Sequence, residues 1–378
     1  MTGVAVLGST GSIGRQTLEV VSAHPERFEV LALASGHPSD AFDAQLRAYP
    51  NARAWCDGGH PDTIGGNRWA DGGLEELATL DGVELVVVAT TGMAALPAVL
   101  AALGAGRRVA LANKETLVTG GHLVDVELAR LGGDRLDHLR PIDSEHSAIW
   151  QCLVGERIDD VARLVLTASG GPFRGRAPDE LASVTPTDAL AHPTWRMGPK
   201  ITIDSATLVN KAFEVIEAQW LYRLPYSKIE AVIHPQSVVH SLVEFADGSH
   251  KAQLGLPDMR LPIQYALTHP RRLPSPAKRS SPADWGSLEF LPLTDADYPA
   301  YRVVREAAAR GGNRGAILNA ADEVAVAAFL AERIPFPAIA GTIADAVERW
   351  GTDREPSMNQ IAGLDLEVRE ALGAELPA

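Results

Sequence analysis

The sequence predicts an α/β fold with a Rossmann-like parallel sheet domain, then an α+β domain, then a C-terminal helical bundle. Three observations predict this order. Short β-branched runs alternate with helical patterns over residues 4–113, the rhythm changes after Asp143, and only helical periodicity remains after Tyr298. Strands and helices that alternate along a chain are typical of a parallel sheet with helices on both faces.

Length and composition support several globular domains in one chain. Its 378 residues exceed the ~250–300 at which a single core stops growing. Hydrophobic residues make up 46% of the chain and charged residues 22%, as is typical of soluble globular proteins. We place the domains at residues 1–142, 143–268 and 297–378, with a linker at 269–296.

The first domain is expected to be built from strands and helices in turn. Strands are predicted at residues 4–8, 28–35, 84–90 and 107–113, and helices from Gly14, near Ala41 and near Ala94. Because consecutive parallel strands need a crossover connection, this alternation indicates successive βαβ units.

Different patterns mark the remaining domains. The middle domain is predicted to hold a helix from about Glu145, a strand at 162–169, a helix after Asp204, and strands within 231–245 and 250–256. Asp247-Gly248 is a hairpin signal between the last two strands. A segment rich in Pro and Ser at 269–285 then precedes terminal helices, which are expected at 301–311, 316–334 and 338–350.

Charge and cysteine content exclude several classes of protein. A net charge of −14 disfavours nucleic-acid and anionic-membrane partners, which need a basic surface. The apolar stretch at 85–105 is divided by Thr90 to Gly92 and by Pro97, so no membrane span is expected.

The cysteines and the start of the first strand bear on the compartment. Cys56 and Cys152 lack metal-binding spacing and favour a reducing cytoplasm. A first strand at Val4 leaves no room for a signal peptide.

A glycine pattern after the first predicted strand indicates a dinucleotide site. Gly8, Gly11 and Gly14 in GSTGSIG follow the strand and open a helix, where amide groups can bind a pyrophosphate. The alternative is a tight strand–helix turn without a ligand. The second strand ends in Ala34-Ser35-Gly36-His37 without an acidic residue, which favours NADP over NAD, with Ser35 and His37 as possible contacts.

Two acidic segments are candidates for a site that binds a hard metal ion. Asp143 and Glu145 follow a predicted strand end, where residues two apart in extended chain project to one side. The alternative is a helix N-cap with a first-turn charge. Asp204 or Ser205 is expected to cap a later helix, on which Asn210, Lys211 and Glu214 share one face. That face alone also fits a surface Lys–Glu pair.

Between these segments lie a candidate anion site and a candidate flap. The amides of Ser169-Gly170-Gly171 could form an anion nest at a strand end. The loop His192–Gly198 carries Pro193, Trp195 and Met197, which suggests an apolar flap that closes over a ligand. A purely structural tryptophan is the alternative.

Taken together, these motifs resemble the 1-deoxy-D-xylulose 5-phosphate reductoisomerase family. The resemblance covers residue 3 to about residue 350 and is carried by GSTGSIG, LANKE, DSEHSAI, SGGPF, HPTWRMGPKITIDSATLVNKAFEVIEA and HPQSVVHSLVEF. It implies NADPH- and divalent-metal-dependent rearrangement and reduction of 1-deoxy-D-xylulose 5-phosphate to 2-C-methyl-D-erythritol 4-phosphate, in non-mevalonate isoprenoid synthesis. It also implies a homodimer with a V-shaped, three-part subunit whose middle domain is catalytic.

The resemblance further implies a role for each matching residue. Metal ligation falls to Asp143, Glu145 and Glu214, with Mg²⁺, Mn²⁺ and Co²⁺ all acceptable, and the catalytic residues are Lys114, Glu145 and His192. The residues implied to bind the phosphorylated substrate are Lys114, Ser144, Glu145, Ser169, His192, Trp195, Ser205, Asn210, Lys211 and Glu214. Those implied to bind NADPH are Thr10, Gly11, Ser12, Ile13, Gly36, Asn113, Glu115 and Gly198, and the glycine pattern and the end of the second strand add Gly8 and His37.

Two positions depart from the family pattern. Gly36-His37-Pro38 stands where the family commonly has Gly-Lys-Asn or Gly-Arg-Asn, so a permanent cation beside the expected 2′-phosphate is missing. Ala212 replaces the usual glycine after Asn-Lys and should stiffen the helix.

Two rival functions are distinguishable. A plain NADP-dependent dehydrogenase would need an activated cysteine, and neither Cys56 nor Cys152 lies in a suitable segment. A non-catalytic NADPH sensor would not require the three carboxylates.

Overall fold

The computed structural model describes residues 1–59, 68–195 and 197–377. The chain forms two compact units that do not follow chain order. The first unit consists of residues 1–116, 123–150 and 258–279, and the second of residues 117–122, 151–257 and 280–378. The segment 143–268, expected as one domain, therefore contributes to both units.

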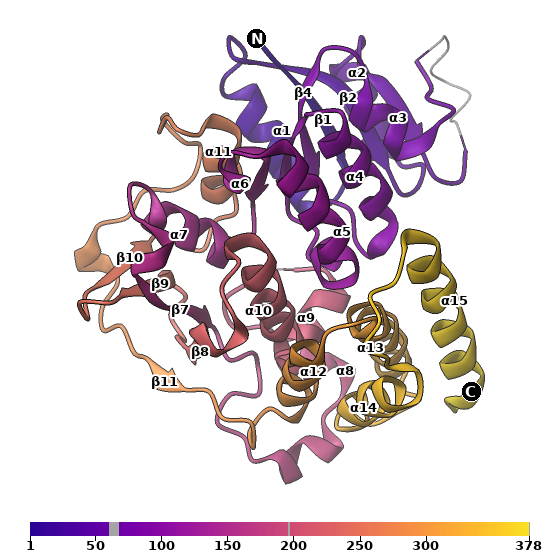
Figure 1. Ribbon diagram of the computed structural model, residues 1–378, viewed down its shortest axis with the longest axis vertical. Helices are drawn as coiled ribbons and strands as arrows, with labels where there is room; N and C mark the ends of the chain where they lie inside the picture. The colour runs from indigo at the N-terminus through magenta and orange to yellow at the C-terminus, as the bar shows by residue number, and fades with distance from the viewer. Residues whose placement is uncertain (60–67, 196, 378) are drawn as a thin grey trace. The chain divides into compact units, whose positions relative to one another are not determined.

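A six-stranded parallel sheet forms the centre of the first unit, with strand order β3-β2-β1-β4-β5-β6 (Figure 1). The strands are β1 (Thr2–Leu7), β2 (Phe28–Ser35), β3 (Arg53–Cys56), β4 (Val83–Val88), β5 (Arg108–Leu111) and β6 (Leu139–Pro141). β1 and β4 are almost wholly buried, as their apolar runs require. The expected Rossmann-like sheet is confirmed, and its order reverses between β1 and β4, where such folds bind ligands.

Helices cover both faces of this sheet. The helices of this unit are α1 (Ser12–Ser22), α2 (Asp40–Ala48), α3 (Gly73–Thr79), η1 (Met93–Ala95), α4 (Leu96–Gly104), α5 (Glu115–Leu131), α6 (Arg135–His138), α7 (Ser144–Leu153), which continues into the second unit from residue 151, and α11 (Arg260–Thr268). α3 packs beside α4, and α11 beside α1. Arg140 on β6 donates to the carbonyl of Ala266 over 2.8 Å, so α11 joins this unit from far along the chain.

α1 begins two residues before the expected Gly14. α5 has a kink at Gly120, and residues 117–122 of this helix belong to the second unit.

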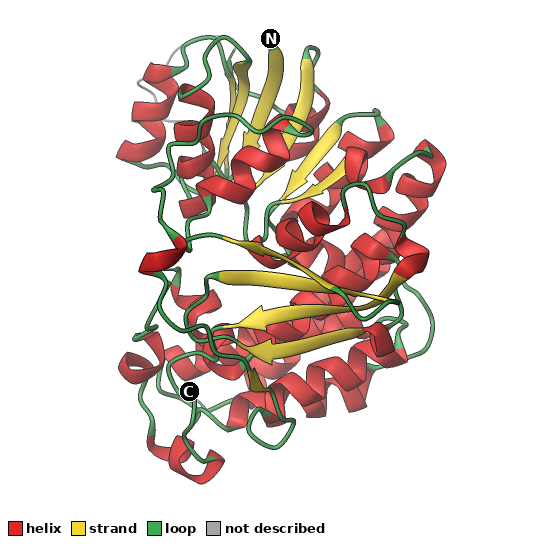
Figure 2. Cartoon of the chain, turned by 90° about the vertical axis from the view of Figure 1, so that its left-hand side faces the viewer, coloured by secondary structure: helices red, strands yellow, loops and turns green. Residues whose placement is uncertain are grey.

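The second unit contains a five-stranded mixed sheet of order β10-β9-β7-β8-β11 (Figure 2). Its strands are β7 (Val161–Ala168), β8 (Ile229–Ile233), β9 (Val239–Phe245), β10 (His250–Leu254) and β11 (Leu291–Pro292). β7 and β8 are parallel and the other pairs antiparallel. The predicted hairpin at Asp247-Gly248 is confirmed, because β9 and β10 pair across it and Gly248 has a φ of +84°.

Helices accompany this second sheet and form the C-terminal bundle. They are η2 (Ile158–Asp160), η3 (Pro178–Ser183), α8 (Pro186–Leu190), α9 (Pro199–Thr207), α10 (Val209–Tyr222), η4 (Tyr226–Lys228), η5 (Pro282–Asp284), α12 (Pro299–Arg310), α13 (Arg314–Leu330), α14 (Ala338–Trp350) and α15 (Met358–Glu375). α13 packs against α14 and α15, and α10 against α12. Helical periodicity predicted the three helices α12 to α14, whereas α15 was not predicted.

The helix expected to begin at Asp204 or Ser205 is in fact two helices, so that cap assignment is wrong. α9 starts at Pro199 after Gly198, and both expected cap residues lie inside it. Proline at the first helical position has the right φ and needs no amide partner, which explains this earlier start. Leu208, at a φ of +58°, then separates α9 from α10. Across the described residues, no helix has the length and apolar character needed to cross a lipid bilayer.

Candidate active site

Glycines fix the turn between β1 and α1. Gly8 has a φ of +86°, and a Cβ there would lie 2.5 Å from the carbonyl oxygen of Ala89, just after β4. A Cβ on Gly14 would lie 2.2 Å from the carbonyl oxygen of Gly8. Side chains at either position would push the turn away from its neighbours. The first-turn amides of α1 have no acceptor within the helix, which suits a bound pyrophosphate.

Side chains hold this turn to the neighbouring strand and helix. The Ser9 hydroxyl donates to the side-chain oxygen of Gln45 over 2.7 Å, and the Gln45 amide donates back to the Ser9 carbonyl over 2.8 Å. The Thr10 hydroxyl lies 2.9 Å from the hydroxyl of Ser35. Ser35 is buried and donates to the carbonyl of His37, so it supports the loop from within.

The loop after β2 has room for a phosphorylated ribose. Gly36 and His37 are exposed, and a Cβ on Gly36 would have no neighbour within 4 Å. β2 ends without the carboxylate that usually binds a ribose 2′-hydroxyl. Gly11, Ser12 and Ile13 are at least partly exposed at the start of α1. The expected cofactor residues of this unit therefore fit an NADP-type dinucleotide.

Asn113 ties together the loops after β4 and β5. Its side-chain amide donates to the carbonyls of Thr90 and Gly92 and to the Glu115 carboxylate, over 2.8–3.1 Å. Its side-chain oxygen accepts from both the amide and the hydroxyl of Thr116. Asn113 is 1% exposed. Its own structural role is to fix the loop at the same sheet edge as the glycine turn.

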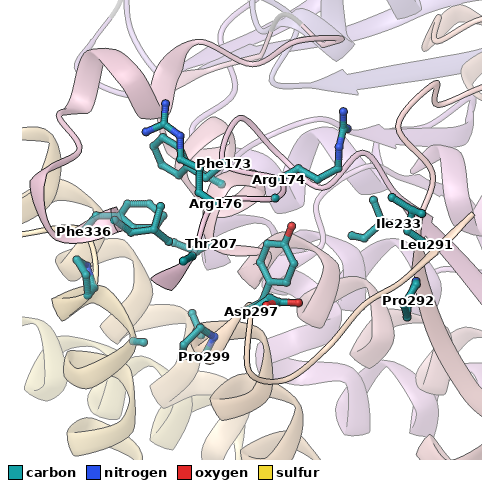
Figure 3. Close-up of a pocket in the computed structure, with 18 residues that line it drawn as sticks. Phe173, Arg174, Arg176, Thr207, Ile233, Leu291, Pro292, Asp297, Pro299 and Phe336 are labelled. Carbon is teal, nitrogen blue, oxygen red and sulfur yellow. The ribbon is translucent and has the colours of Figure 1, made fainter. Parts of the chain in front are cut away.

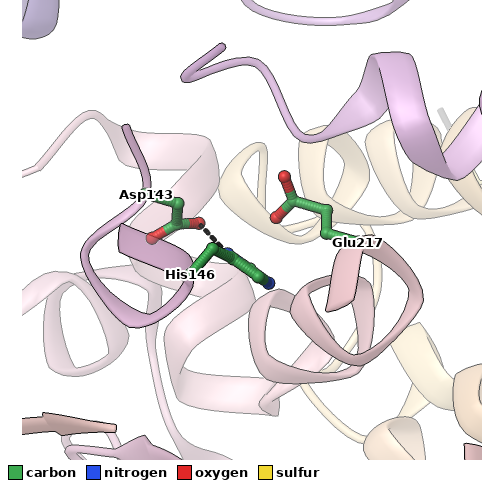
Figure 4. Close-up of side chains that lie close together, drawn as sticks. All are labelled: Asp143, His146 and Glu217. Carbon is green, nitrogen blue, oxygen red and sulfur yellow. Dashed lines mark ion pairs between the residues drawn. The ribbon is translucent and has the colours of Figure 1, made fainter. Parts of the chain in front are cut away.

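The first acidic segment forms a small charged cluster within the first unit. Lys114 Nζ donates to Asp143 Oδ2 over 2.8 Å, and both side chains are largely buried. His146 Nδ1 lies 3.9 Å from the same oxygen (Figure 4). The Ser144 hydroxyl donates to Glu145 over 2.5 Å. The expectation that Asp143 and Glu145 lie in an extended segment is wrong, because Ser144 and Glu145 form the first turn of α7.

The second acidic segment lies on α10. Lys211 Nζ donates to Glu214 Oε2, and Asn210 donates to Glu214 Oε1 over 2.5 Å. Lys211 and Glu214 are 3% and 1% exposed. The predicted shared face is confirmed, and the alternative of a surface Lys–Glu pair is wrong because both groups are buried. A buried carboxylate held by a cation on one side and an amide on the other is oriented rather than mobile.

A histidine organises the start of the expected flap. His192 Nδ1 accepts from the backbone amides of Thr194 and Trp195 over 3.1 and 2.9 Å, so the ring proton lies on Nε2. Nε2 therefore donates to the Ser169 hydroxyl over 3.0 Å. Partial burial lowers the pKa of His192 below its ordinary value, which keeps the ring neutral.

The turn after β7 packs directly on α9. Gly170 and Gly171 have φ values of +86° and +67°. The backbone amide of Gly171 donates to the Ser169 hydroxyl over 3.3 Å, and this hydrogen bond helps to fix the turn. A Cβ on Gly171 would lie 2.6 Å from the carbonyl oxygen of Ser205. The expected substrate residues Ser169 and Ser205 therefore lie in adjoining segments. Gly198, expected at the cofactor, lies in this unit as the residue before α9.

Sequence reasoning missed several supporting residues. His146 lies one helical turn from Asp143, and that spacing within DSEH could have revealed it. Lys200 contacts Asp204 at 2.7 Å and Asp322 at 2.6 Å, and both carboxylates are buried. No local pattern links α9 to α13, so this contact could not be read from the sequence.

The chain matches family models over most of its length. The model of 1-deoxy-D-xylulose 5-phosphate reductoisomerase matches residues 4–57 and 66–121, and models of its C-terminal domains match residues 139–222 and 254–371. The chain belongs to the 1-deoxy-D-xylulose 5-phosphate reductoisomerase family. This confirms the resemblance, and with it the assignment to the NADP-dependent oxidoreductases.

Individual members of the reductoisomerase family are similar along nearly the whole chain. Those of Pelotomaculum thermopropionicum and Thermomicrobium roseum are 46% and 49% identical, covering 98% and 94% of this chain and 97% and 92% of their own lengths. A crystal structure of a reductoisomerase in complex with NADPH, fosmidomycin and magnesium superimposes with a TM-score of 0.90 at 36% identity. This match covers 99% of this chain and 98% of the other.

Family membership agrees with the state of the two cysteines. Cys56 and Cys152 are both buried and free. Burial raises the pKa of the Cys56 thiol, and raises that of Cys152 to about 11. Neither thiol is a thiolate near neutral pH, so neither supplies the activated nucleophile that the rival dehydrogenase would need.

Proposed function

We propose that this chain converts 1-deoxy-D-xylulose 5-phosphate to 2-C-methyl-D-erythritol 4-phosphate with NADPH and a divalent cation. One observation carries the proposal: a reductoisomerase-family chain buries a Glu214 carboxylate between Lys211 and Asn210. A similar structure, 36% identical, was crystallised with NADPH, fosmidomycin and magnesium, which supports the same cofactors here.

We assign the cation to Asp143, Glu145 and Glu214. The donor set fits because carboxylate oxygens are the ligands that Mg²⁺ and Mn²⁺ prefer, and Co²⁺ also accepts them. When bound, the ion would polarise the substrate carbonyl and acidify the adjacent hydroxyl. Three carboxylates carry more charge than one divalent ion offsets, and Lys114, 2.8 Å from Asp143, reduces that excess.

We assign Lys114, Ser144 and Glu145 to the reacting end of the substrate. Lys114 is largely buried and holds its ammonium group at the Asp143 carboxylate, where it can donate to a substrate hydroxyl. The Ser144 hydroxyl, which orients Glu145, lies at the start of the same helix. Groups fixed in this way before binding lower the entropy cost of aligning the ketose for rearrangement.

We assign Ser169, Ser205, Asn210 and Lys211 to the substrate phosphate. Lys211 supplies a buried cation, and the other three supply hydroxyl or amide donors. His192 stays neutral, donates to Ser169, and holds the backbone of Trp195, so it can couple phosphate binding to closure of the flap. The phosphate takes no part in bond changes, but its binding energy can drive that closure.

We assign NADPH, which would supply the hydride when bound, to the carboxyl edge of the parallel sheet. The glycine turn and the α1 amides would hold the pyrophosphate, Gly36 and His37 the 2′-phosphate, and Asn113 and Glu115 the nicotinamide side of the cofactor. Gly36-His37 offers at most one titratable cation, so we expect weaker NADP preference than a lysine or arginine would give.

We further propose a cytoplasmic homodimer whose functional segments are 1–142, 143–268, 269–296 and 297–378. Two buried free cysteines without a disulfide support the reducing compartment.

Product identification tests the proposed reaction. The purified chain is incubated with 1-deoxy-D-xylulose 5-phosphate, NADPH and Mg²⁺, and the products are separated and analysed by mass spectrometry and NMR. We expect 2-C-methyl-D-erythritol 4-phosphate in amounts equal to the NADPH consumed, and none when chelator is present. Formation of an unbranched polyol phosphate would contradict the proposal, because that product requires reduction without rearrangement.

A further inference from the structure

The second unit contains a cavity of about 480 Å³ with largely apolar walls (Figure 3). Its lining comes from the loop after β7, the end of α9, the segment before α12 and the start of α14. Phe173 and Phe336 form one wall, with ring centroids 5.0 Å apart in an edge-to-face arrangement. Ile233 and Ala340 also line it. The volume lies in the range of pockets that bind small molecules.

Two arginines give the rim of this cavity a positive charge. Arg174 and Arg176 lie on one loop, and Figure 3 shows both guanidinium groups on the same side of the cavity. Both are exposed, and Arg176 lies over the Phe173 ring at 5.4 Å from its centroid. Among the described residues of the lining, the one acid is Asp297, which accepts a hydrogen bond from Thr294. Apolar walls below two arginines favour an anion that carries an apolar chain.

Residues that line the cavity contact the turn that we assign to the substrate phosphate. Arg174 donates to the carbonyl of Ser169 over 2.8 Å, and the Tyr298 hydroxyl donates to the carbonyl of Gly170 over 3.1 Å. Ala206 and Thr207, which follow Ser205 in α9, line the cavity directly. A ligand that displaced Arg174 or Tyr298 would therefore shift the backbone of the Ser169–Gly171 turn.

We propose that this cavity is a second ligand site, which binds an amphipathic anion consisting of a phosphate-monoester or carboxylate head and an apolar chain. The apolar chain of the ligand lies between Phe173, Phe336 and Ala340, and its anionic head group contacts Arg176 at the rim. The site is distinct from that of the polar ketose phosphate, which has no apolar chain to fill these walls. Its effect on substrate affinity rests on the proposed function of Ser169 and Ser205, whereas binding itself does not.

Calorimetry with octyl phosphate tests the binding site directly. We expect octyl phosphate to bind the full-length protein saturably, at least about tenfold more tightly than inorganic phosphate or octanol. The phosphate head group and the octyl chain of the ligand should each contribute to its affinity. Equal affinity for octanol would overturn the anion site, and equal affinity for inorganic phosphate would overturn the apolar one.

Two variants locate the bound molecule. Ala340→Trp fills the cavity and should abolish octyl phosphate binding, while Arg176→Ala should weaken it by about tenfold. Arg310→Ala, which removes an exposed arginine at the end of α12 outside the lining, should leave it unchanged. Binding that survives both cavity changes, or that is lost in Lys211→Ala instead, would overturn the proposal by locating the ligand elsewhere. All variants are first checked for an unchanged unfolding midpoint, and Arg176→Ala decides if Ala340→Trp does not fold.

Kinetics test the coupling between the two sites. Saturating octyl phosphate should change the KM for 1-deoxy-D-xylulose 5-phosphate in the wild type and leave it unchanged in Ala340→Trp, which keeps basal turnover. The same KM shift in both proteins would overturn the coupling, since it would indicate competition at the substrate site. If the chain does not turn over this ketose, the calorimetry still decides whether the cavity binds the anion.

Discussion

Single residues decide the shape of the glycine turn. Gly8 and Gly14 meet backbone atoms that cannot move aside, whereas Gly36 faces open space. The same residue type therefore has a packing role at two positions and leaves room for a ligand at the third. The spacing in GSTGSIG predicted the turn, but only the distances show which glycines tolerate a side chain.

Gly14→Ala should destabilise the protein by about 1–3 kcal/mol, because its Cβ would lie 2.2 Å from the Gly8 carbonyl oxygen and force α1 away from the turn. Affinity for NADPH should fall with it. Gly36→Ala is the matched control and should change the free energy of unfolding by less than about 0.5 kcal/mol. Chemical denaturation of both variants measures this, and equal stability of the two would contradict the packing role of Gly14.

His192 provides a pH-dependent prediction. Its Nδ1 accepts two backbone amides, so protonation there would break both contacts at the start of the flap. Its pKa is lowered by burial, so between the folded pKa and the ordinary value of 6.5 the unfolded chain binds more protons. The contribution of His192 to the free energy of unfolding therefore decreases as the pH falls from 6.5 to the folded pKa. Below the folded pKa it no longer changes.

NMR titration of the His192 ring measures this pKa. We expect a value below 6.5, with the proton on Nε2 in the neutral form. In Ser169→Ala the pKa should stay low, because burial is its cause. A value above 6.5 in the wild type would show that the flap begins with a charged histidine instead.

At the scale of elements, the sequence was informative wherever the periodicity was local. Buried runs such as Val83–Val88 identified the parallel strands, and helical spacing placed Asn210, Lys211 and Glu214 on one face. The break at Leu208 was not predictable, because a leucine at positive φ carries no local signal and depends on the surrounding packing. The position of α11 in the first unit also depends on distant contacts, such as the hydrogen bond from Arg140 to Ala266.

The contact between α9 and α13 gives a stability prediction. Lys200 is placed between Asp204, which is 2% exposed, and Asp322, which is fully buried. Burial raises the pKa of Asp322 in the folded protein. The ionised carboxylate therefore destabilises the fold at pH values above this raised pKa, and the destabilisation is relieved as the pH falls through it. Lys200→Met should cost about 3 kcal/mol at neutral pH, because two buried carboxylates lose their cation.

Thermal and chemical unfolding of Lys200→Met check this cost. The deficit should be smaller at acidic pH, and adding Asp322→Asn should recover part of it. Lys200→Arg keeps the charge and serves as control. A Lys200→Met protein as stable as the wild type at neutral pH would show that the two helices do not depend on this cation.

At the scale of the whole molecule, the chain distributes its chemistry over two units. Lys114 and Asp143 form one charged cluster, and Lys211 and Glu214 form another on α10. The net charge of −14 means that an anionic substrate must rely on these few buried cations. Motif order along the chain indicated the family, while the division into units, with residues 258–279 returning to the first, was beyond sequence reasoning.

Metal-dependent turnover tests the central claim most directly. The rate of NADPH oxidation with 1-deoxy-D-xylulose 5-phosphate is measured with and without Mg²⁺ for the wild type, Glu214→Gln and Glu370→Gln, an exposed control on α15. We predict turnover that requires the metal, that is kept in Glu370→Gln, and that falls by about a hundredfold or more in a folded Glu214→Gln protein. Metal-independent turnover, or a Glu214→Gln variant as active as the wild type, would contradict the account.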